Sequence, residues 1–412
     1  MKAVAHIDAN YYYAQLEALY RPDIRNKAFV VGGDQESRKG IVLTKSPAAK
    51  KMGIKTGSSI REAMGIYPNL IVVPANYPMY LHFSHRMREI VLEYTDTIKP
   101  FGSDEMWCQL YGDKKAVMKT VQDIRQAIWK QLCLTVSIGV GDNLPYAKLG
   151  SDSAPNNGVM EMWNEDRETV VYPLPVSELL YVGPATTNKF KNYGINTIGD
   201  LAKTCPERVC QILRNKTGAS LWAMAAGHDK TPVASIESVS DIKSIGNSNT
   251  MPRDLVNDDD VRAAFYMLGE SVAERMRENG FEATVLQITI RDNDLYSFQR
   301  QMKLQRPTNL CAELVPAAME LFKRNYRWST NKPIRSIGIR GSDLVPEGAA
   351  YQMTVFDDEV RRDKLELLER CVDRLRGQYG HSIIQRAVLK KERLKGVNAN
   401  NDIGDAPTFY QY

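Results

Sequence analysis

Three carboxylates in the first 105 residues could hold metal ions. Asp8 ends the first strand-like run, and Asp104 and Glu105 follow directly after a predicted strand turn. Adjacent acids repel unless a cation lies between them, and Mg²⁺ prefers carboxylate and phosphate oxygens. Two such ions would activate a hydroxyl and stabilise a leaving pyrophosphate, which is phosphoryl-transfer chemistry. This interpretation requires the two strands to be neighbours; otherwise Asp104 and Glu105 are a solvated pair on a loop.

The elements that must position these acids follow the pattern of a small α+β sheet. Apolar strand-like runs alternate with helical periodicity, at 3–8, 80–94 (helix), 98–110 (two strands), about 115–131 (helix) and 134–141. This is the β-α-β-β-α-β order of a ferredoxin-like sheet. The segment 14–75 has strand-like runs of its own, and we expect it to be inserted into the sheet as a separate unit.

Two further regions follow. Short helical segments joined by glycine turns around Gly183 and Gly194 are typical of helix-hairpin-helix elements, which offer backbone N–H groups to phosphates. A plain helical bundle with glycine caps fits these residues equally well. A second unit with the order β-α-β-β-α-β is predicted over 243–342. It is followed by a tail with an amphipathic helix and a basic run.

One predicted strand of this second unit has a long polar, partly basic face. Its apolar side chains, Phe298, Met302 and Leu304, share one parity, and the polar face consists of Gln299, Gln301, Lys303 and Gln305. Such a face suits a sugar-phosphate backbone, but a solvated strand would have the same pattern.

Composition limits the function classes without choosing among them. The 412 residues, 43% hydrophobic and 8% aromatic, exclude a single small module and an unfolded chain. A net charge of +5 permits a polyanionic partner but does not require one. Six scattered cysteines without C-x-x-C pairs argue against disulfides and zinc. With strand-length apolar runs and no signal-peptide core, we expect no membrane segment.

Four motifs together resemble those of the Y-family, translesion DNA polymerases. The run from Asp8 to Glu17 is similar to the family's opening motif, in which an acid at a strand end precedes aromatic residues, Ala and Glu. The other three resemble its fingers motif, its second acidic motif and the strand-helix that closes its palm, at 44–54, 101–110 and 136–152. The tripeptide Gly141-Asp-Asn143 and the long tail look most like those of the UmuC-like, bacterial branch.

The resemblance implies an α+β multidomain fold: a ferredoxin-like palm with inserted fingers, a helix-hairpin-helix thumb, a β-α-β-β-α-β little finger and a tail. It also implies that Asp8, Asp104 and Glu105 bind two Mg²⁺ ions, with the backbone carbonyl of Ala9 as a further ligand. The expected boundaries are palm 1–13 and 76–165, fingers 14–75, thumb 166–232, linker 233–242, little finger 243–345 and tail 346–412.

Nucleotide contacts by Tyr12, Tyr13, Thr44 and Lys50 are implied in the same way. Tyr13, beside Tyr12, matches the family's steric gate, a ring under the C2′ carbon that leaves no room for a ribose hydroxyl. From the residues alone, this tyrosine run would be a buried aromatic cluster. Thr44 and Lys50 match fingers positions that hold the triphosphate, the first by its hydroxyl and the second by its charge.

The sequence departs from the family pattern at one phosphate-binding position. Many relatives have a Lys-Pro pair where this chain has Ser153-Ala-Pro-Asn-Asn-Gly158. Either Lys50 or Lys148 compensates for the missing lysine, or the chain binds nucleotide more weakly than its relatives.

A short tail segment resembles the peptide by which bacterial polymerases bind the sliding clamp. Its matching residues are Gln352, Met353, Val355 and Phe356. Such a peptide would fill a pocket on the clamp with its apolar pair. The alternative is that these side chains pack on the little finger.

The function expected from this resemblance is a template-directed, error-prone DNA polymerase that adds deoxynucleotides to a primer 3′-hydroxyl in lesion bypass. Its partners would be primer-template DNA, deoxynucleoside triphosphates and a sliding clamp. It would act in the cytoplasm of a bacterium, close to the nucleoid. Two alternatives stay open: a DNA-binding accessory factor of the same fold with weak or no activity, and a nucleotide cyclase, because that palm also serves cyclases.

Overall fold

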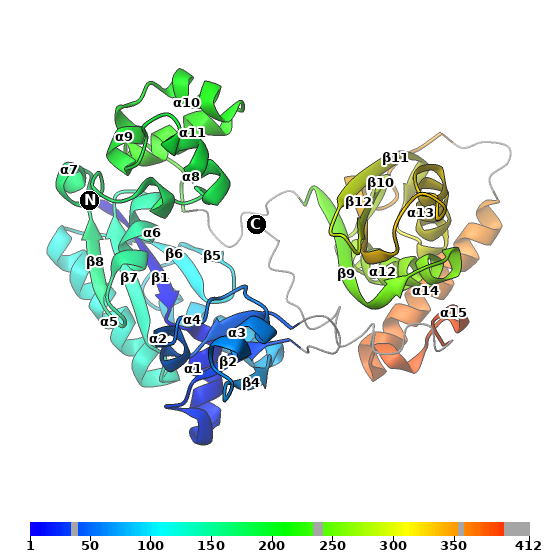
Figure 1. The fold of residues 1–412 in the computed structure, drawn as a ribbon, viewed down its shortest axis with the longest axis horizontal. Coiled ribbons are helices and arrows are strands. Elements are labelled where there is room, and N and C mark those ends of the chain that lie inside the picture. Colours follow the sequence, from blue (N-terminus) through cyan, green and yellow to red (C-terminus); the bar gives the residue numbers. More distant parts are fainter. Residues whose placement is uncertain (34–39, 234–241, 353–357, 391–412) are drawn as a thin grey trace.

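The computed structural model describes residues 1–33, 40–233, 242–352 and 358–390 (Figure 1). This part of the chain contains three sheets, of five, four and three strands, and a separate cluster of short helices. The mixed α and β architecture agrees with the expected fold class.

The first sheet contains β1 (Lys2–Ala9), β5 (Ile98–Phe101), β6 (Glu105–Tyr111), β7 (Val136–Gly141) and β8 (Val159–Met162). Its order is β5-β6-β1-β7-β8, so the strand that carries Asp8 lies directly beside the strand that begins at Glu105. The edge strand β8 was not predicted. It runs parallel to β7, and its four residues, Val-Met-Glu-Met, are too few to establish a strand period.

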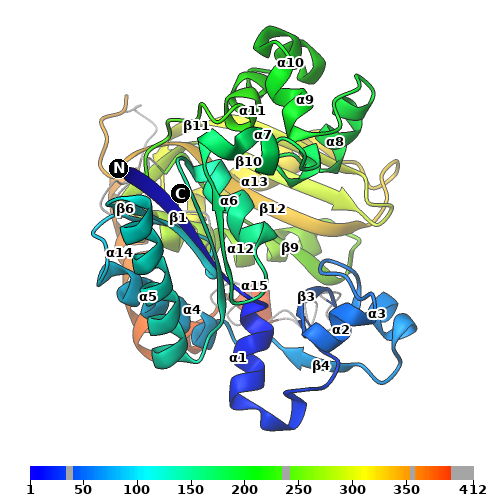
Figure 2. The ribbon, with the colours of Figure 1, turned by 90° about the vertical axis from the view of Figure 1, so that its left-hand side faces the viewer.

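The two faces of this sheet have different covers. Helices α4 (Tyr77–Leu92) and α5 (Lys114–Leu132) pack on one face, and α6 (Leu144–Ser153) packs on the other (Figure 2). Successive side chains of a strand point to opposite faces. In β1, Ala3, Ala5 and Ile7 therefore join the core under α4 and α5, whereas Val4 belongs to the cluster under α6. His6 and Asp8 have the parity of Val4 and lie on the α6 side.

Close packing of α6 on β7 depends on two glycines. A Cβ atom on Gly139 would lie 2.0 Å from the carbonyl oxygen of Ala147, and one on Gly150 would lie 2.8 Å from the Cα of Gly139. Neither distance is compatible with a side chain, so the glycine pair lets the helix backbone rest on the strand. This contact places the polar side of α6 over His6 and Asp8.

The inserted unit has a sheet of its own. Strands β2 (Phe29–Gly32), β3 (Val42–Lys45) and β4 (Ile71–Pro74) are ordered β3-β2-β4, with the short helices α2 (Pro47–Lys51) and α3 (Ile60–Ile66) beside them. Their small core includes Val30, Val42 and Ile60. Helix α1 (Tyr12–Tyr20), by contrast, buries Ala14 and Leu16 in the core of the five-stranded sheet.

A cluster of short helices follows the first sheet in the chain. They are α7 (Arg167–Val170), α8 (Pro184–Lys191), α9 (Ile198–Lys203), α10 (Pro206–Leu213) and α11 (Thr217–Ala225). Their buried side chains form one cluster with Tyr146 and Leu149 of α6, so this helical unit is anchored on the helix that covers the acidic face of the sheet. The turn between α8 and α9 contains Gly194 with φ +78°, a conformation that favours glycine.

The second β-α-β-β-α-β unit forms the four-stranded sheet, ordered β11-β10-β12-β9. Its strands are β9 (Ser244–Leu255), β10 (Phe281–Asp292), β11 (Ser297–Thr308) and β12 (Ile334–Pro346), and its helices are α12 (Asp258–Glu278) and α13 (Cys311–Asn325). Phe298, Met302 and Leu304 pack against the core of this unit, and the polar side chains between them are exposed, which confirms the expected parity of β11.

The tail helix α14 (Glu359–Tyr379) is tied to this unit by a buried ion pair, and η4 (His381–Ile383) and α15 (Ala387–Lys390) follow it. Arg277 Nη1 lies 2.8 Å from Glu369 Oε2, and their side chains are 5% and 7% exposed. Glu369 also accepts hydrogen bonds from the backbone N–H groups of Cys311 and Ala312, so it caps the start of α13. No helix in the described ranges has the length and apolar character that a membrane crossing requires.

We expect Glu369→Ala to destabilise the four-stranded unit by about 3 kcal/mol in free energy of unfolding, because it leaves the buried Arg277 charge with less compensation and uncaps α13. Urea unfolding of the full chain, followed by fluorescence, measures this change. Glu366→Ala is the matched control, since Glu366 contacts Arg370 on the same helix at a more exposed position. Equal midpoints for the two variants would contradict the prediction.

Candidate functional site

The acids predicted from the sequence meet at one end of the strand pair β1 and β6. Asp8 is directly opposite Glu105 in the antiparallel register. The backbone N–H of Ala9 donates to the carbonyl oxygen of Asp104 at 2.9 Å, which brings the β5–β6 turn against the end of β1. Asp8 and Glu105 therefore lie together at this strand end, and Asp104 lies in the adjoining turn, close enough for the charge of Asp8 to act on it.

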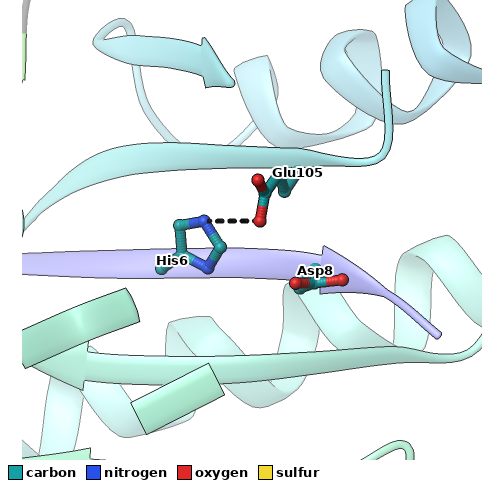
Figure 3. Close-up of side chains that lie close together, drawn as sticks. All are labelled: His6, Asp8 and Glu105. Atoms are coloured by element: carbon teal, nitrogen blue, oxygen red, sulfur yellow. Dashed lines mark ion pairs between the residues drawn. The ribbon is translucent and has the colours of Figure 1, made fainter. Parts of the chain in front are cut away.

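His6, which the sequence analysis did not single out, belongs to the same region. Ligand atoms of His6, Asp8 and Glu105 all lie within 4.8 Å of one another (Figure 3). The imidazole is fully buried, with Nδ1 2.7 Å from Ser151 Oγ and Nε2 3.4 Å from Glu105 Oε2. Its position two residues before Asp8, on the same strand face, is the signal that could have identified it.

A lysine on α6 lies at the centre of the acids. The Nζ atom of Lys148 is 3.0 Å from Asp8 Oδ2, 2.5 Å from Glu105 Oε2 and 3.0 Å from Asp152 Oδ1. Lys148 and Asp152 are four residues apart and so share one face of the helix. The sequence could have shown that pair, but not that it lies over β1.

Burial and the charges of neighbouring acids make Asp104 and Glu105 reluctant to ionise. Burial first, and then the charge of Asp8, raise the pKa of Asp104 to about 6. Burial also raises the pKa of Glu105, against the attraction of Lys148 and with the help of Asp8 and Asp104. Burial alone would lower the pKa of Lys148, but the neighbouring carboxylates outweigh it and raise that pKa. The lysine therefore stays charged, and the acids repel one another.

The donor set fits a hard divalent cation. Asp8, Asp104 and Glu105 supply carboxylate oxygens, and the carbonyl of Ala9 follows directly in the chain. Carboxylate, carbonyl and phosphate oxygens are the ligands that Mg²⁺ prefers. A cation here would also relieve the repulsion that raises the pKa of Asp104. The residues present are thus suited to metal ions of this kind.

Tyr13 is held in a cluster of aromatic rings. It stacks on Tyr80 with ring centroids 4.1 Å apart and planes 12° apart, and it meets Tyr77 edge-on. Its hydroxyl lies 3.3 Å from the Oγ of the buried Ser103, the residue before Asp104. The buried Tyr12 donates a hydrogen bond to the carbonyl of Tyr80 at 2.6 Å. The rings therefore hold Tyr13 beside the acidic turn, and Tyr77 and Tyr80 were missed because they are remote in sequence.

The inserted unit places positive charge near the same strand end. Thr44 lies on β3, opposite Val31 of β2. The exposed Lys50, at the end of α2, donates to the hydroxyl of Tyr11 at 3.5 Å, and Tyr11 is three residues beyond Asp8. Burial and then the charge of Lys50 lower the pKa of Lys45, so the positive charges of these two lysines repel each other. Two adjacent cations favour an anionic ligand.

Two further expectations concern the clamp-like peptide and the missing lysine after α6. Of the clamp-like peptide, Gln352 is within the described residues, but Met353, Val355 and Phe356 lie outside them. At the position of the missing lysine, α6 ends at Ser153, and the ammonium of Lys148 is directed at the acids.

Comparisons with known proteins assign the chain to a family. The model of the impB/mucB/samB family matches residues 7–152, and that of its C-terminal domain matches residues 242–355. The chain is 41% identical to the DNA polymerase IV of Acetivibrio thermocellus over 398 residues, which are 95% of this chain and 98% of that relative. It is 33% identical to DNA polymerase IV 1 of Bacillus subtilis, with 97% of both chains covered.

A solved structure has the same fold. It is a Y-family DNA polymerase chimera of Dbh and Dpo4, 21% identical, with a TM-score of 0.73 over 84% of this chain and 100% of that one. The matched residues include Asp8, Asp104 and Glu105, and the two family models together span both large α/β units of the chain. The chain therefore belongs to the impB/mucB/samB family, within the Y-family of translesion DNA polymerases.

Proposed function

We propose that this protein is a template-directed, error-prone DNA polymerase that adds deoxynucleotides to a primer 3′-hydroxyl during lesion bypass. The observation that carries the proposal is the convergence of Asp8, Asp104 and Glu105 at one strand end, in a chain whose relatives are named DNA polymerase IV. None of the relatives described above bears the name of a cyclase or an accessory factor.

In the proposed reaction, the primer hydroxyl attacks the α-phosphate of the incoming nucleotide and pyrophosphate leaves. Asp8, Asp104, Glu105 and the carbonyl of Ala9 would hold two Mg²⁺ ions. These ions, when bound, supply an activated hydroxyl and compensate the charge that develops on the phosphate oxygens. The protein's own contribution is to keep the acids in register across β1 and β6, so that little reorganisation accompanies each addition.

The nucleotide would lie between the acidic strand end and the inserted unit. Lys50 and Lys45 supply positive charge to its triphosphate, with the hydroxyl of Thr44 beside them on β3. Tyr13, fixed by its stack on Tyr80, would lie under the sugar and exclude a 2′-hydroxyl. Tyr12 acts through the backbone of Tyr80, which it holds in place.

Two partners are proposed beyond the nucleotide. The exposed polar side chains of β11, including Lys303, would follow the sugar-phosphate backbone of primer-template DNA. The peptide from Gln352 to Phe356 would tether the enzyme to a sliding clamp and raise its effective concentration at the primer end. Its place of action would be the bacterial cytoplasm, at the nucleoid.

We expect Asp104→Asn to reduce primer extension by at least about a hundredfold, because the variant loses a charged metal ligand. Extension of a labelled primer with Mg²⁺ measures this, and binding of the same primer-template is expected to stay unchanged. Asp123→Asn, at an exposed position on α5, is the matched control. Full extension by Asp104→Asn would remove the metal-binding role.

We expect Tyr13→Ala to reduce discrimination against ribonucleotides by about ten- to a hundredfold, since the ring that excludes the 2′-hydroxyl is gone. Single-nucleotide insertion with matched deoxy- and ribonucleotides gives the ratio of kcat/KM values. Tyr20→Ala, at the exposed end of the same helix, should leave that ratio unchanged. An unaltered ratio in Tyr13→Ala would show that another group selects the sugar.

A further inference from the structure

The acidic cluster already contains a cation of the protein itself. Lys148 Nζ forms ion pairs with Asp8 Oδ2, Glu105 Oε2 and Asp152 Oδ1 at 3.0, 2.5 and 3.0 Å. Its side chain is only 14% exposed, whereas Asp152 is 47% exposed at the outer side of the cluster. The ammonium thus lies between two acids at the strand end and a third acid nearer to solvent.

Ser151 orients the ring of His6 beside these acids. The Ser151 hydroxyl has one proton, and it donates to the carbonyl oxygen of Lys148 at 2.8 Å. The 2.7 Å contact with His6 must then use a proton on Nδ1, and Nε2 lies 3.4 Å from Glu105 Oε2. Lys148 is the ammonium group that contacts both Asp8 and Glu105.

The atoms that Lys148 holds are the ones that a metal ion would need. Its two inner partners, Asp8 Oδ2 and Glu105 Oε2, belong to the proposed metal ligands. An ammonium and a divalent cation that share these oxygens would repel each other at short range. The ammonium has a third partner, Asp152, four residues along α6, so it can leave the inner acids without losing all of its charge compensation.

We propose that Lys148 is a resident counter-ion that competes with the catalytic metal for Asp8 and Glu105 and is transferred to Asp152 when metal binds. The proposal rests on the metal-binding role of the acids given above. It makes Lys148 a positioning residue: the ammonium keeps the acids together in the metal-free protein and lowers their affinity for metal. Stable metal binding then depends on the added negative charge of a nucleotide triphosphate.

The experiment is a titration of the full-length protein with Mn²⁺, without DNA or nucleotide, in which electron paramagnetic resonance reports free Mn²⁺. We expect Lys148→Met to bind Mn²⁺ at least about tenfold more tightly than the unmodified protein, because a competing charge has been removed. Lys130→Met, at an exposed position on α5, is the matched control and should leave the affinity unchanged. Weaker or equal binding by Lys148→Met would overturn the proposal.

We expect Asp152→Asn to lower the affinity for Mn²⁺, whereas Lys148→Met raises it. It removes the outer partner of Lys148, so the ammonium stays on the inner acids and Mn²⁺ should bind more weakly. Combined with Lys148→Met, the same change should have a smaller effect, because the two side chains act through one ion pair. An equal loss of affinity in both backgrounds would mean that Asp152 acts on the metal directly, and would overturn the transfer step.

A second readout covers the stability of the metal-free protein. In EDTA, Lys148→Met should unfold at a lower temperature than the unmodified protein, since its partly buried acids lose their counter-ion. Mn²⁺ should restore more stability to this variant than to the unmodified protein. Failure of the proposed function looks different: the unmodified protein and Asp104→Asn would then bind Mn²⁺ equally. If Asp104→Asn loses binding while Lys148→Met gains none, only the counter-ion inference fails.

Discussion

The antiparallel register of β1 and β6 is the constraint on which the site depends. It places Asp8 opposite Glu105, and the hydrogen bond from Ala9 to the carbonyl of Asp104 draws the turn against the same strand end. Like charges at this distance oppose folding unless a cation compensates them. The fold holds them there because the other face of the sheet buries a continuous apolar core under α4 and α5.

Packing on the acidic face is as specific as the register. The glycine pair Gly139 and Gly150 lets α6 approach β7, and only this approach brings Lys148 over the acids. A side chain at either position would lift the helix and separate the ammonium from Asp8 and Glu105. Charge balance at the site is therefore controlled by backbone packing, which links the stability of the sheet to the state of the acidic cluster.

Sequence reasoning could predict what is periodic and could not predict what is tertiary. The apolar runs and the order of elements predicted the sheet, but they left open whether the strands of Asp8 and Glu105 are neighbours, which the register of β1 and β6 shows. His6 has the right parity, yet nothing in the sequence shows that α6 buries it. Tyr13 precedes the inserted unit in the sequence and Tyr80 follows it, so their stacking could not be predicted from the spacing of residues. The strand β8 was missed because four residues carry no clear period.

The positions of Lys148, Lys45 and Lys50 show which positive charges could compensate for the missing lysine after α6. Lys148 is committed to the acids, so it cannot serve the triphosphate while metal is absent. Lys45 and Lys50 are neighbours on the inserted unit, and burial with mutual repulsion lowers the pKa of Lys45. An approaching triphosphate relieves that repulsion, which favours its binding. In the proposed reaction, Lys45 and Lys50 would therefore supply the positive charge for the triphosphate from the inserted unit.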